Sequence, residues 1–201
     1  MKLTDFFKKI SQSSKYEMRN HLLAEIKKAI EGWDKSDIYA VSLFVYDRSD
    51  NPFEPTVTLG YNTEENYRKE IPNAWDEAEA RWNYAFWLQN NEYYFGVGET
   101  QPIVKQWIES KGYRYYTYDE VFASDQDIPE EAYEGITEAF VEELILIVRD
   151  LHDSGFIRSQ FGKDVPVLIH ELEYYDEIAK QNLAANPHHI MDGFVRFCIG
   201  G

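Results

Sequence analysis

The sequence predicts a single α+β domain over residues 1–201, with a mostly antiparallel sheet packed by several helices. Two long segments, 15–31 and 130–153, place apolar residues at the spacing of amphipathic helices. Between them, residues 38–46 and 56–61 are rich in β-prone side chains and flank a run of turn formers, which predicts a hairpin. The chain has 201 residues, 44% of them hydrophobic, which is enough for one sizeable core.

The first predicted helix is marked at both ends. Ser14 and Glu17 have the spacing of a capping box, and Gly32 stands where a helix would stop. The apolar residues between them recur at helical spacing: Leu22, Leu23, Ile26, Ala29 and Ile30. We expect an earlier helical turn or two over residues 6–10, separated from the main helix by a break at residues 11–14.

Residues 38–46 form the clearest strand. Both of its faces are largely apolar, which is typical of a central strand covered on two sides. Residues 47–55 are full of turn formers, so residues 56–61 are predicted to return as the second strand of a long-looped hairpin. Thr63 is expected to cap the helix that follows, whose first turn is acidic.

The middle of the chain gives weaker patterns. Residues 81–88 fit either a helix or a strand, and we favour a strand over residues 84–88 that continues over 92–95 after a turn at Asn90 and Asn91. Residues 100–110 predict a short helix. Residues 113–118 are strongly β-prone because most of them are tyrosines.

The longest predicted helix follows. Pro129 suits the first turn of a helix that runs to Asp153. Its inward stripe recurs at helical spacing: Ile136, Phe140, Leu144, Ile147, Val148 and Leu151. Beyond it we expect a strand over residues 165–173, a helix over 176–185 and a last apolar element of open type over 190–199.

The composition argues against several classes of protein. A net charge of −16 and a pI near 4.7 oppose binding to nucleic acid and to anionic membranes, because their phosphates would repel the chain. No apolar run approaches the roughly 20 residues that span a bilayer, and the first residues lack the apolar stretch of a signal peptide. With one cysteine, Cys198, an intramolecular disulfide is ruled out, and we expect a cytoplasmic protein.

The negative charge is concentrated in one segment. Residues 119–153 contain twelve carboxylates and one basic residue, Arg149, and so hold −11 of the total charge. Four glutamates of the predicted helix are spaced three or four residues apart and are expected to share one face: Glu131, Glu134, Glu138 and Glu142. Tyr115 and Tyr118 lie just before this segment and are candidates for partner contact, because tyrosine is favoured in binding hot spots.

No motif in the chain assigns a reaction. None of the five histidines has the spacing of a zinc site, although a tertiary site joining His152, His170, His188 and Asp192 stays open. Cys198 lies in an apolar run and is expected to be a buried structural thiol. The sequence therefore gives no catalytic residue, no metal ligand and no cofactor, and it leaves the oligomeric state open.

Three passages together resemble a known family. They are Ile38-Tyr39-Ala40-Val41-Ser42-Leu43, Asn62-Thr63-Glu64-Glu65 and Arg81-Trp82-Asn83-Tyr84-Ala85-Phe86-Trp87. In this order they resemble bacterial proteins of unknown function and of similar length, some of them found near toxin–immunity loci. Those proteins are similar in context to immunity proteins of the Smi/Knr superfamily. The resemblance implies a bacterial, cytoplasmic protein with an immunity role.

Three functions compete at this stage. The favoured one is protein binding, in which the acidic field steers a basic partner, such as a toxin to be neutralised, and tyrosines then dock it. The alternative is a metal-dependent or hydrolytic enzyme built from scattered histidines and carboxylates, which predicts a concave pocket with shifted pKa values. The third is a structural protein whose charge serves only solubility.

Overall fold

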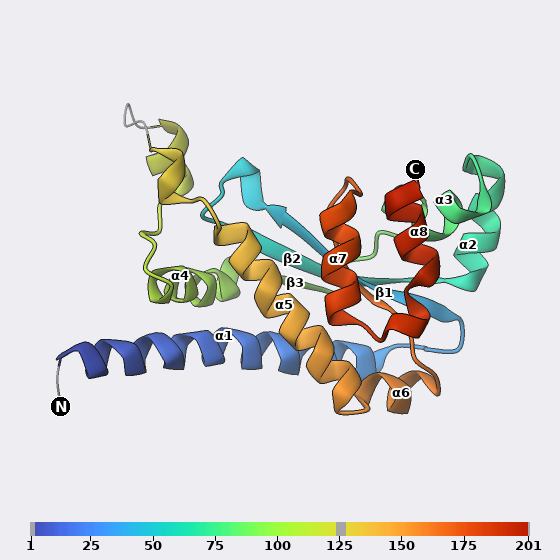
Figure 1. Cartoon of the computed structure of the whole chain (residues 1–201), viewed down its shortest axis with the longest axis horizontal. Helices are drawn as coiled ribbons and strands as arrows, with labels where there is room; N and C mark the ends of the chain where they lie inside the picture. Colours follow the sequence, from blue (N-terminus) through green and yellow to red (C-terminus); the bar gives the residue numbers. More distant parts are fainter. Residues whose placement is uncertain (1–2, 124–127, 201) are drawn as a thin grey trace.

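A four-stranded sheet lies at the centre of the fold. The computed structural model describes residues 3–123 and 128–200 (Figure 1). The strands are β1 (Ile38–Asp47), β2 (Pro55–Thr63), β3 (Tyr93–Phe95) and β4 (Val167–His170), in the order β3-β2-β1-β4. β1 pairs antiparallel with β2 and parallel with β4, while β2 pairs antiparallel with β3. The predicted single α+β domain with a mostly antiparallel sheet is confirmed.

The central place of β1 explains why both of its faces are apolar. Val41, Leu43 and Val45 belong to a large hydrophobic core on one face of the sheet, the main core. Ala40 belongs to a smaller core on the other face, the second core, together with Leu168 of β4. Because alternate side chains of a strand point to opposite faces, a strand between two cores has to be apolar throughout.

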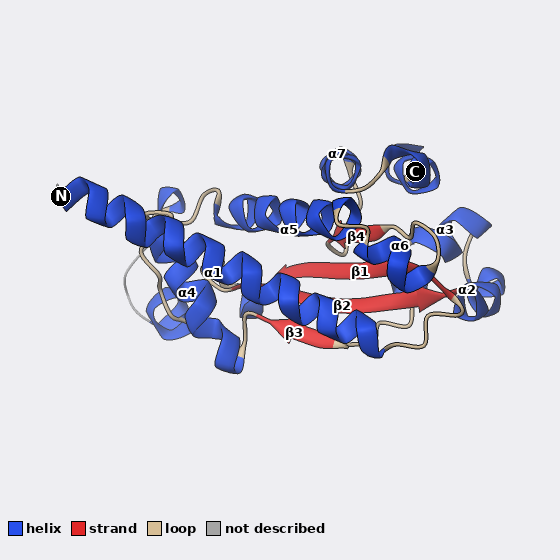
Figure 2. Ribbon diagram, turned by 90° about the horizontal axis from the view of Figure 1, so that it is seen from below, coloured by secondary structure: helices blue, strands red, loops and turns tan. Residues whose placement is uncertain are grey.

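Three helices cover the main core: α1 (Leu3–Gly32), α4 (Gln101–Ser110) and α5 (Ile136–Asp153). Figure 2 shows α1 crossing in front of the sheet. Its inward residues repeat every four positions and are buried: Met18, Leu22, Ile26 and Ile30. The predicted inward stripe of α5 is buried in full and so confirmed. Among residues 3–123 and 128–200, no helix is both long and apolar enough to cross a membrane.

One acidic residue of α5 points inward. Only 1% of the Glu143 side chain is exposed, and it forms ion pairs with Arg19 of α1 at 2.5 Å and with Lys111, just after α4, at 3.2 Å. Burial alone would raise the pKa of this carboxyl, but the hydrogen bonds and charges of Arg19 and Lys111 outweigh it and lower the pKa. Glu143 thus ties the three helices of the main core together.

The second core is covered by α3 (Glu77–Trp82), α7 (Asp176–Ala185) and α8 (Asp192–Gly200). Arg81 organises its edge, since the guanidinium lies 4.2 Å from the ring centre of Tyr39 and 4.9 Å from that of Tyr67. It also pairs with Glu64 of α2 (Glu64–Glu70) at 2.8 Å. The short helix α6 (Phe156–Phe161) follows α5 and contributes Ile157 to the main core.

Two asparagines, one in α7 and one directly after it, close the outer edge of β4. The Asn182 side chain accepts a hydrogen bond from the Ile169 N–H at 2.9 Å and donates one to the Ile169 carbonyl at 2.6 Å. Asn186 does the same to Val167, at 2.8 and 3.0 Å. Residues i and i+2 of a strand and residues i and i+4 of a helix have similar spacings. The two side-chain amides therefore match the spacing of the free backbone groups of Val167 and Ile169. An edge that would otherwise be open to pairing with another strand is satisfied.

Several sequence predictions are wrong. The expected break at residues 11–14 is absent, because α1 is continuous and the segment contains no glycine or proline to interrupt a helix. The strand predicted over 84–88 is a 3₁₀ turn after α3, since Asn83 accepts a hydrogen bond from the Ala85 N–H. Residues 113–118 form no strand, and β4 covers only Val167–His170 of the range expected over 165–173.

The start of the long helix also needs correction. Pro129 precedes a separate 3₁₀ turn over Glu130–Ala132, and α5 begins only at Ile136. Gly135 lies between them with a φ of +84°, a left-handed conformation that ends helical continuity and suits glycine. The last element, whose type the sequence left undetermined, is helical. It consists of a 3₁₀ turn at His188–Ile190 followed by α8.

Candidate functional site

A cavity of about 840 Å³ opens at the carboxyl ends of β1 and β4, and we call it the acidic pocket. Asp47 is the last residue of β1, and Glu171 directly follows the last residue of β4. The parallel pairing of these strands brings both carboxylates to one edge of the sheet, where ligands of open α/β sheets commonly bind. Asp50, Thr137 and Glu173 add to the polar lining.

Asp47 is the most perturbed carboxylate of the acidic pocket. Burial raises the pKa of this carboxyl to about 6, and the charges of Glu171, Glu138 and Asp50 act in the same direction. The hydroxyl of Thr137 donates a hydrogen bond to the carboxylate at 3.2 Å, which opposes the shift only in part. The folded protein therefore holds a negative charge here at an energetic cost near neutral pH.

The walls of the acidic pocket are aromatic and aliphatic. Phe44, Tyr46 and Tyr175 line it, and Leu172 stands at its mouth with 72% of its surface exposed. No lysine or arginine is among the lining residues in the part of the chain that the structure describes. Carboxylates together with aromatic faces are the groups that hold ammonium and guanidinium ions. The arrangement is suited to receive a cation from outside the chain.

The four glutamates predicted to share a helix face do not all lie on one helix. Glu138 and Glu142 are exposed on α5, as expected. Glu131 lies on the preceding 3₁₀ turn, and Glu134 lies in the link before Gly135. Both are exposed, but they precede α5 rather than lie on it. The prediction that the four glutamates form one stripe on a single helix is therefore wrong. The Glu134 carbonyl accepts a hydrogen bond from the Tyr113 hydroxyl at 2.8 Å, which fixes this turn against the tyrosine segment.

The two candidate tyrosines have different environments. Tyr118 is 49% exposed, and its ring centre lies 4.9 Å from that of Phe122, which is 50% exposed. We call this pair the aromatic tip. It opens a π-helical turn whose first residues, Asp119 and Glu120, are acidic. Tyr115 is only 8% exposed, so its ring offers little surface to a partner in this conformation.

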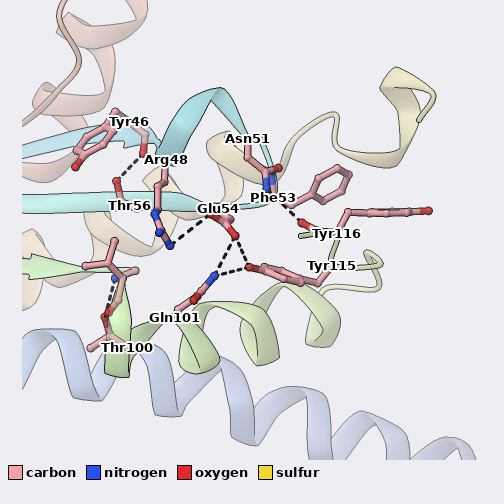
Figure 3. A network of polar contacts seen from close by, with 12 residues as sticks. Tyr46, Arg48, Asn51, Phe53, Glu54, Thr56, Thr100, Gln101, Tyr115 and Tyr116 are labelled. Carbon is pink, nitrogen blue, oxygen red and sulfur yellow. Dashed lines mark hydrogen bonds and ion pairs between the residues drawn. The ribbon is translucent and has the colours of Figure 1, made fainter. Parts of the chain in front are cut away.

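Tyr115 belongs to a buried network around Glu54 (Figure 3). Its hydroxyl donates to Glu54 Oε1 at 2.8 Å, and Gln101 donates to the same oxygen at 3.0 Å. Arg48 lies 3.7 Å from the other carboxylate oxygen. Burial, followed by the hydrogen bond to Glu54, raises the pKa of Tyr115 to about 12. Tyr115 is therefore held as a neutral donor that fastens the tyrosine segment to the loop between β1 and β2.

That loop connects the acidic pocket to the aromatic tip. Asp47 directly precedes the loop and Asp50 lies within it, and both line the pocket. Further along it, the Asn51 amide donates to the Tyr116 carbonyl at 3.3 Å, two residues before Tyr118. Figure 1 shows the loop between β1 and β2 beside the olive and gold segment that contains the tip. The loop thus contributes to the acidic pocket and also contacts the segment that leads to the aromatic tip.

The histidines are dispersed rather than gathered. His170 is buried with its Nε2 2.8 Å from the Ser42 hydroxyl, and burial lowers the pKa of this imidazole to about 4. His152 contacts the Asn186 amide, and His189 pairs with Asp164. Among the described residues no group of three histidine, cysteine or acidic side chains is placed to hold a metal ion. The tertiary site considered from the sequence does not form there.

Sequence reasoning missed the acids that define the acidic pocket. Asp47 and Asp50 look like ordinary turn formers, and Glu171 looks like a solvent-facing strand residue. Their proximity follows from the parallel pairing of β1 with β4, which no local pattern announces. The signal that was available is an acidic residue at the end of each of two apolar strands. Cys198 is buried, as expected, and burial raises the pKa of its thiol to about 12.

Comparisons with protein-family models, with characterised proteins and with solved structures found no match for this chain. The resemblance to immunity proteins is untested by them and stays a prediction.

Proposed function

We propose that this protein binds a basic protein partner by taking a lysine or arginine side chain into the acidic pocket. The observation that supports the proposal best is the Asp47 carboxylate, which lies among Glu171, Glu138 and Asp50 in a cavity with no basic lining residue among those described. A guest cation relieves the mutual repulsion of these acids and the cost of burying Asp47. This relief adds to the affinity of the acidic pocket for a cationic side chain.

The surrounding surface supports the same function. Long-range attraction toward the acidic face accelerates encounter with a basic protein, and it weakens as salt increases. Once the cation has entered, Tyr175 and Leu172 at the mouth offer apolar contact, and the aromatic tip offers a second contact area. The loop between β1 and β2 lies against both areas, because its Asp50 lines the pocket and its Asn51 donates a hydrogen bond to the Tyr116 carbonyl.

Neutralisation of a toxin is the biological role that we propose for this binding. It rests on the resemblance of residues 38–43, 62–65 and 81–87 to proteins found near toxin–immunity loci. An immunity protein acts by covering its toxin, so it needs a docking surface and no reaction of its own. This part is tested by co-expression with any basic toxin encoded by a neighbouring gene, and the expected outcome is protection from killing that Asp47→Asn and Glu171→Gln together abolish.

The pocket itself is tested with a fluorescent oligolysine peptide. The double variant Asp47→Asn, Glu171→Gln removes two charges from the pocket. A matched control, Glu99→Gln with Glu109→Gln, removes two exposed charges outside it. We expect the pocket variant to bind the peptide at least about tenfold more weakly than the control, a loss of about 1.4 kcal/mol. If both variants bind the peptide equally weakly, its affinity depends only on the total charge of the protein, and the pocket proposal would be wrong.

A further inference from the structure

Large apolar side chains that are strongly exposed occur at few places among the described residues. Trp75 is 94% exposed and Ile199 is 60% exposed. Trp75 precedes α3 and Ile199 lies near the end of α8, and these two helices pack against each other. Figure 1 shows both helices at the right of the molecule, far from the aromatic tip at upper left. This surface, which we call the α3–α8 face, is therefore separate from the proposed binding surface.

A hollow of about 600 Å³ lies between the two helices. Its walls include Tyr67, Trp82 and Phe197, and Trp75 stands at its rim. Gly193 of α8 allows the close approach of the helices here, because a Cβ at this position would lie 3.1 Å from the Trp82 ring. The hollow is thus an aromatic cavity with an exposed indole beside it.

The two rims of the hollow have opposite charge. The α3 rim contains Asp76, Glu77 and Glu79, and the α8 rim contains Arg196. Arg81 of α3 also lines the hollow, but its charge is paired with Glu64 of α2. Asp76 caps α3, and Glu79 accepts a hydrogen bond from the Trp75 N–H. Glu77 and Arg196 line the hollow but form no ion pair within residues 3–123 and 128–200. Each leaves a charge available to a partner.

We propose that the α3–α8 face binds a second copy of this chain about a two-fold axis. In such an interface one patch meets itself, so the acidic, aromatic rim of each protomer faces the basic, aliphatic rim of its partner. Glu77 of each copy then pairs with the partner's Arg196. Trp75 of each copy packs against the partner's Ile199 and the aromatic wall of the hollow. The face is complementary to itself in both charge and apolarity, and this is the reason for choosing a second copy as its occupant.

Sedimentation velocity over a range of protein concentrations tests this proposal. We expect the wild-type protein to dimerise, and Trp75→Ala and Arg196→Glu each to weaken the dimer by about tenfold or more. The double variant Glu77→Arg, Arg196→Glu restores the pair with the signs exchanged, so it should return to within a few-fold of the wild type. Trp75, Glu77 and Arg196 are all exposed, so the variants should keep the fold, which circular dichroism verifies.

Two controls separate the interface from general charge effects. Lys163→Glu and Glu99→Arg make the same changes of charge as the test variants, at exposed positions away from the α3–α8 face. Both should leave the dimer unchanged within about twofold. A wild-type protein that stays monomeric at about 100 μM overturns the proposal, because a dimer with a Kd of that order would be half formed. Equal loss with Lys163→Glu and Arg196→Glu, or no recovery in the double variant, also overturns it.

Discussion

Replacing Asp47 with asparagine should make the protein more stable while weakening its proposed function. Asparagine has nearly the same shape, and its side-chain oxygen can still accept the hydrogen bond from Thr137. What the substitution removes is the buried charge and its repulsion with Glu171, Glu138 and Asp50. Functional sites often retain such costly groups at the expense of stability.

The size and the pH dependence of the effect follow from the raised pKa of Asp47. Folding moves this pKa from 3.8 to about 6, and each tenfold change in proton affinity corresponds to roughly 1.4 kcal/mol. Allowing for partial exposure and solvent screening, we expect Asp47→Asn to raise the free energy of unfolding at pH 7 by about 1–2 kcal/mol. The folded state favours the protonated carboxyl, so this gain should shrink as the pH falls through 6 and vanish near 4, close to the pKa in the unfolded chain.

Urea denaturation of the wild type and the variant at pH 7, 6 and 5 measures this difference. Other groups, such as Glu143 with its lowered pKa, make the same pH-dependent contribution to the free energy of unfolding in both proteins. These contributions cancel in the difference. Glu99→Gln, which removes an exposed charge elsewhere, serves as the control and should show no such trend. If Asp47→Asn lowers stability at pH 7, or if its gain does not depend on pH, the assigned environment of Asp47 is wrong.

Three further substitutions test the scaffold by chemical denaturation. Phe140→Ala should cost about 3–5 kcal/mol, because the ring is fully buried in the main core, and a loss below about 1 kcal/mol would contradict that packing. Glu143→Gln should cost about 2–3 kcal/mol, since it leaves Arg19 and Lys111 without their shared counter-charge at a buried site, and an unchanged stability would rule out this role. Asn182→Ala should cost about 1–3 kcal/mol by leaving the Ile169 N–H unpaired, whereas a neutral effect would show that the edge of β4 finds another partner.

Local patterns in the sequence predicted much of the fold. The run of β-prone residues over 38–46, apolar on both faces, identified β1, and the turn formers after it identified the hairpin with β2. Thr63 caps α2 as expected, since its hydroxyl accepts a hydrogen bond from the Asn66 N–H at 3.1 Å. The stripe from Ile136 to Leu151 is buried as predicted. In each of these cases the deciding information lies within one continuous stretch of the sequence.

The features that were missed depend on distant contacts. The pairing of Val41 with Val167 joins segments far apart in the chain, and it alone brings Asp47 beside Glu171. The aromatic residues over 81–88 are compatible with a strand, but the second core holds Trp82 and Trp87 inside, so tertiary packing overrides their β propensity. An acidic helix face was visible in the sequence, but which glutamate turns inward depended on Arg19 of α1 and on Lys111, just after α4.

The acids of this chain fall into two physical classes, and the difference bears on function. Glu143 and Glu54 are buried but have cationic or hydrogen-bonding partners from other elements, so they stabilise the fold. Among the described residues, the Asp47 carboxylate accepts a hydrogen bond from the Thr137 hydroxyl but has only other carboxylates as charged neighbours, so its charge lowers the stability of the fold near neutral pH. A dimer through the α3–α8 face would leave both acidic pockets open, because that face lies away from the carboxyl edge of β1 (Figure 1). Two open pockets on one rigid particle would bind a partner with two suitably spaced cationic sites more tightly than one pocket does, because the second contact becomes intramolecular. Trp75→Ala should therefore reduce the apparent affinity for an immobilised basic partner without changing the affinity of one pocket for a short oligolysine peptide.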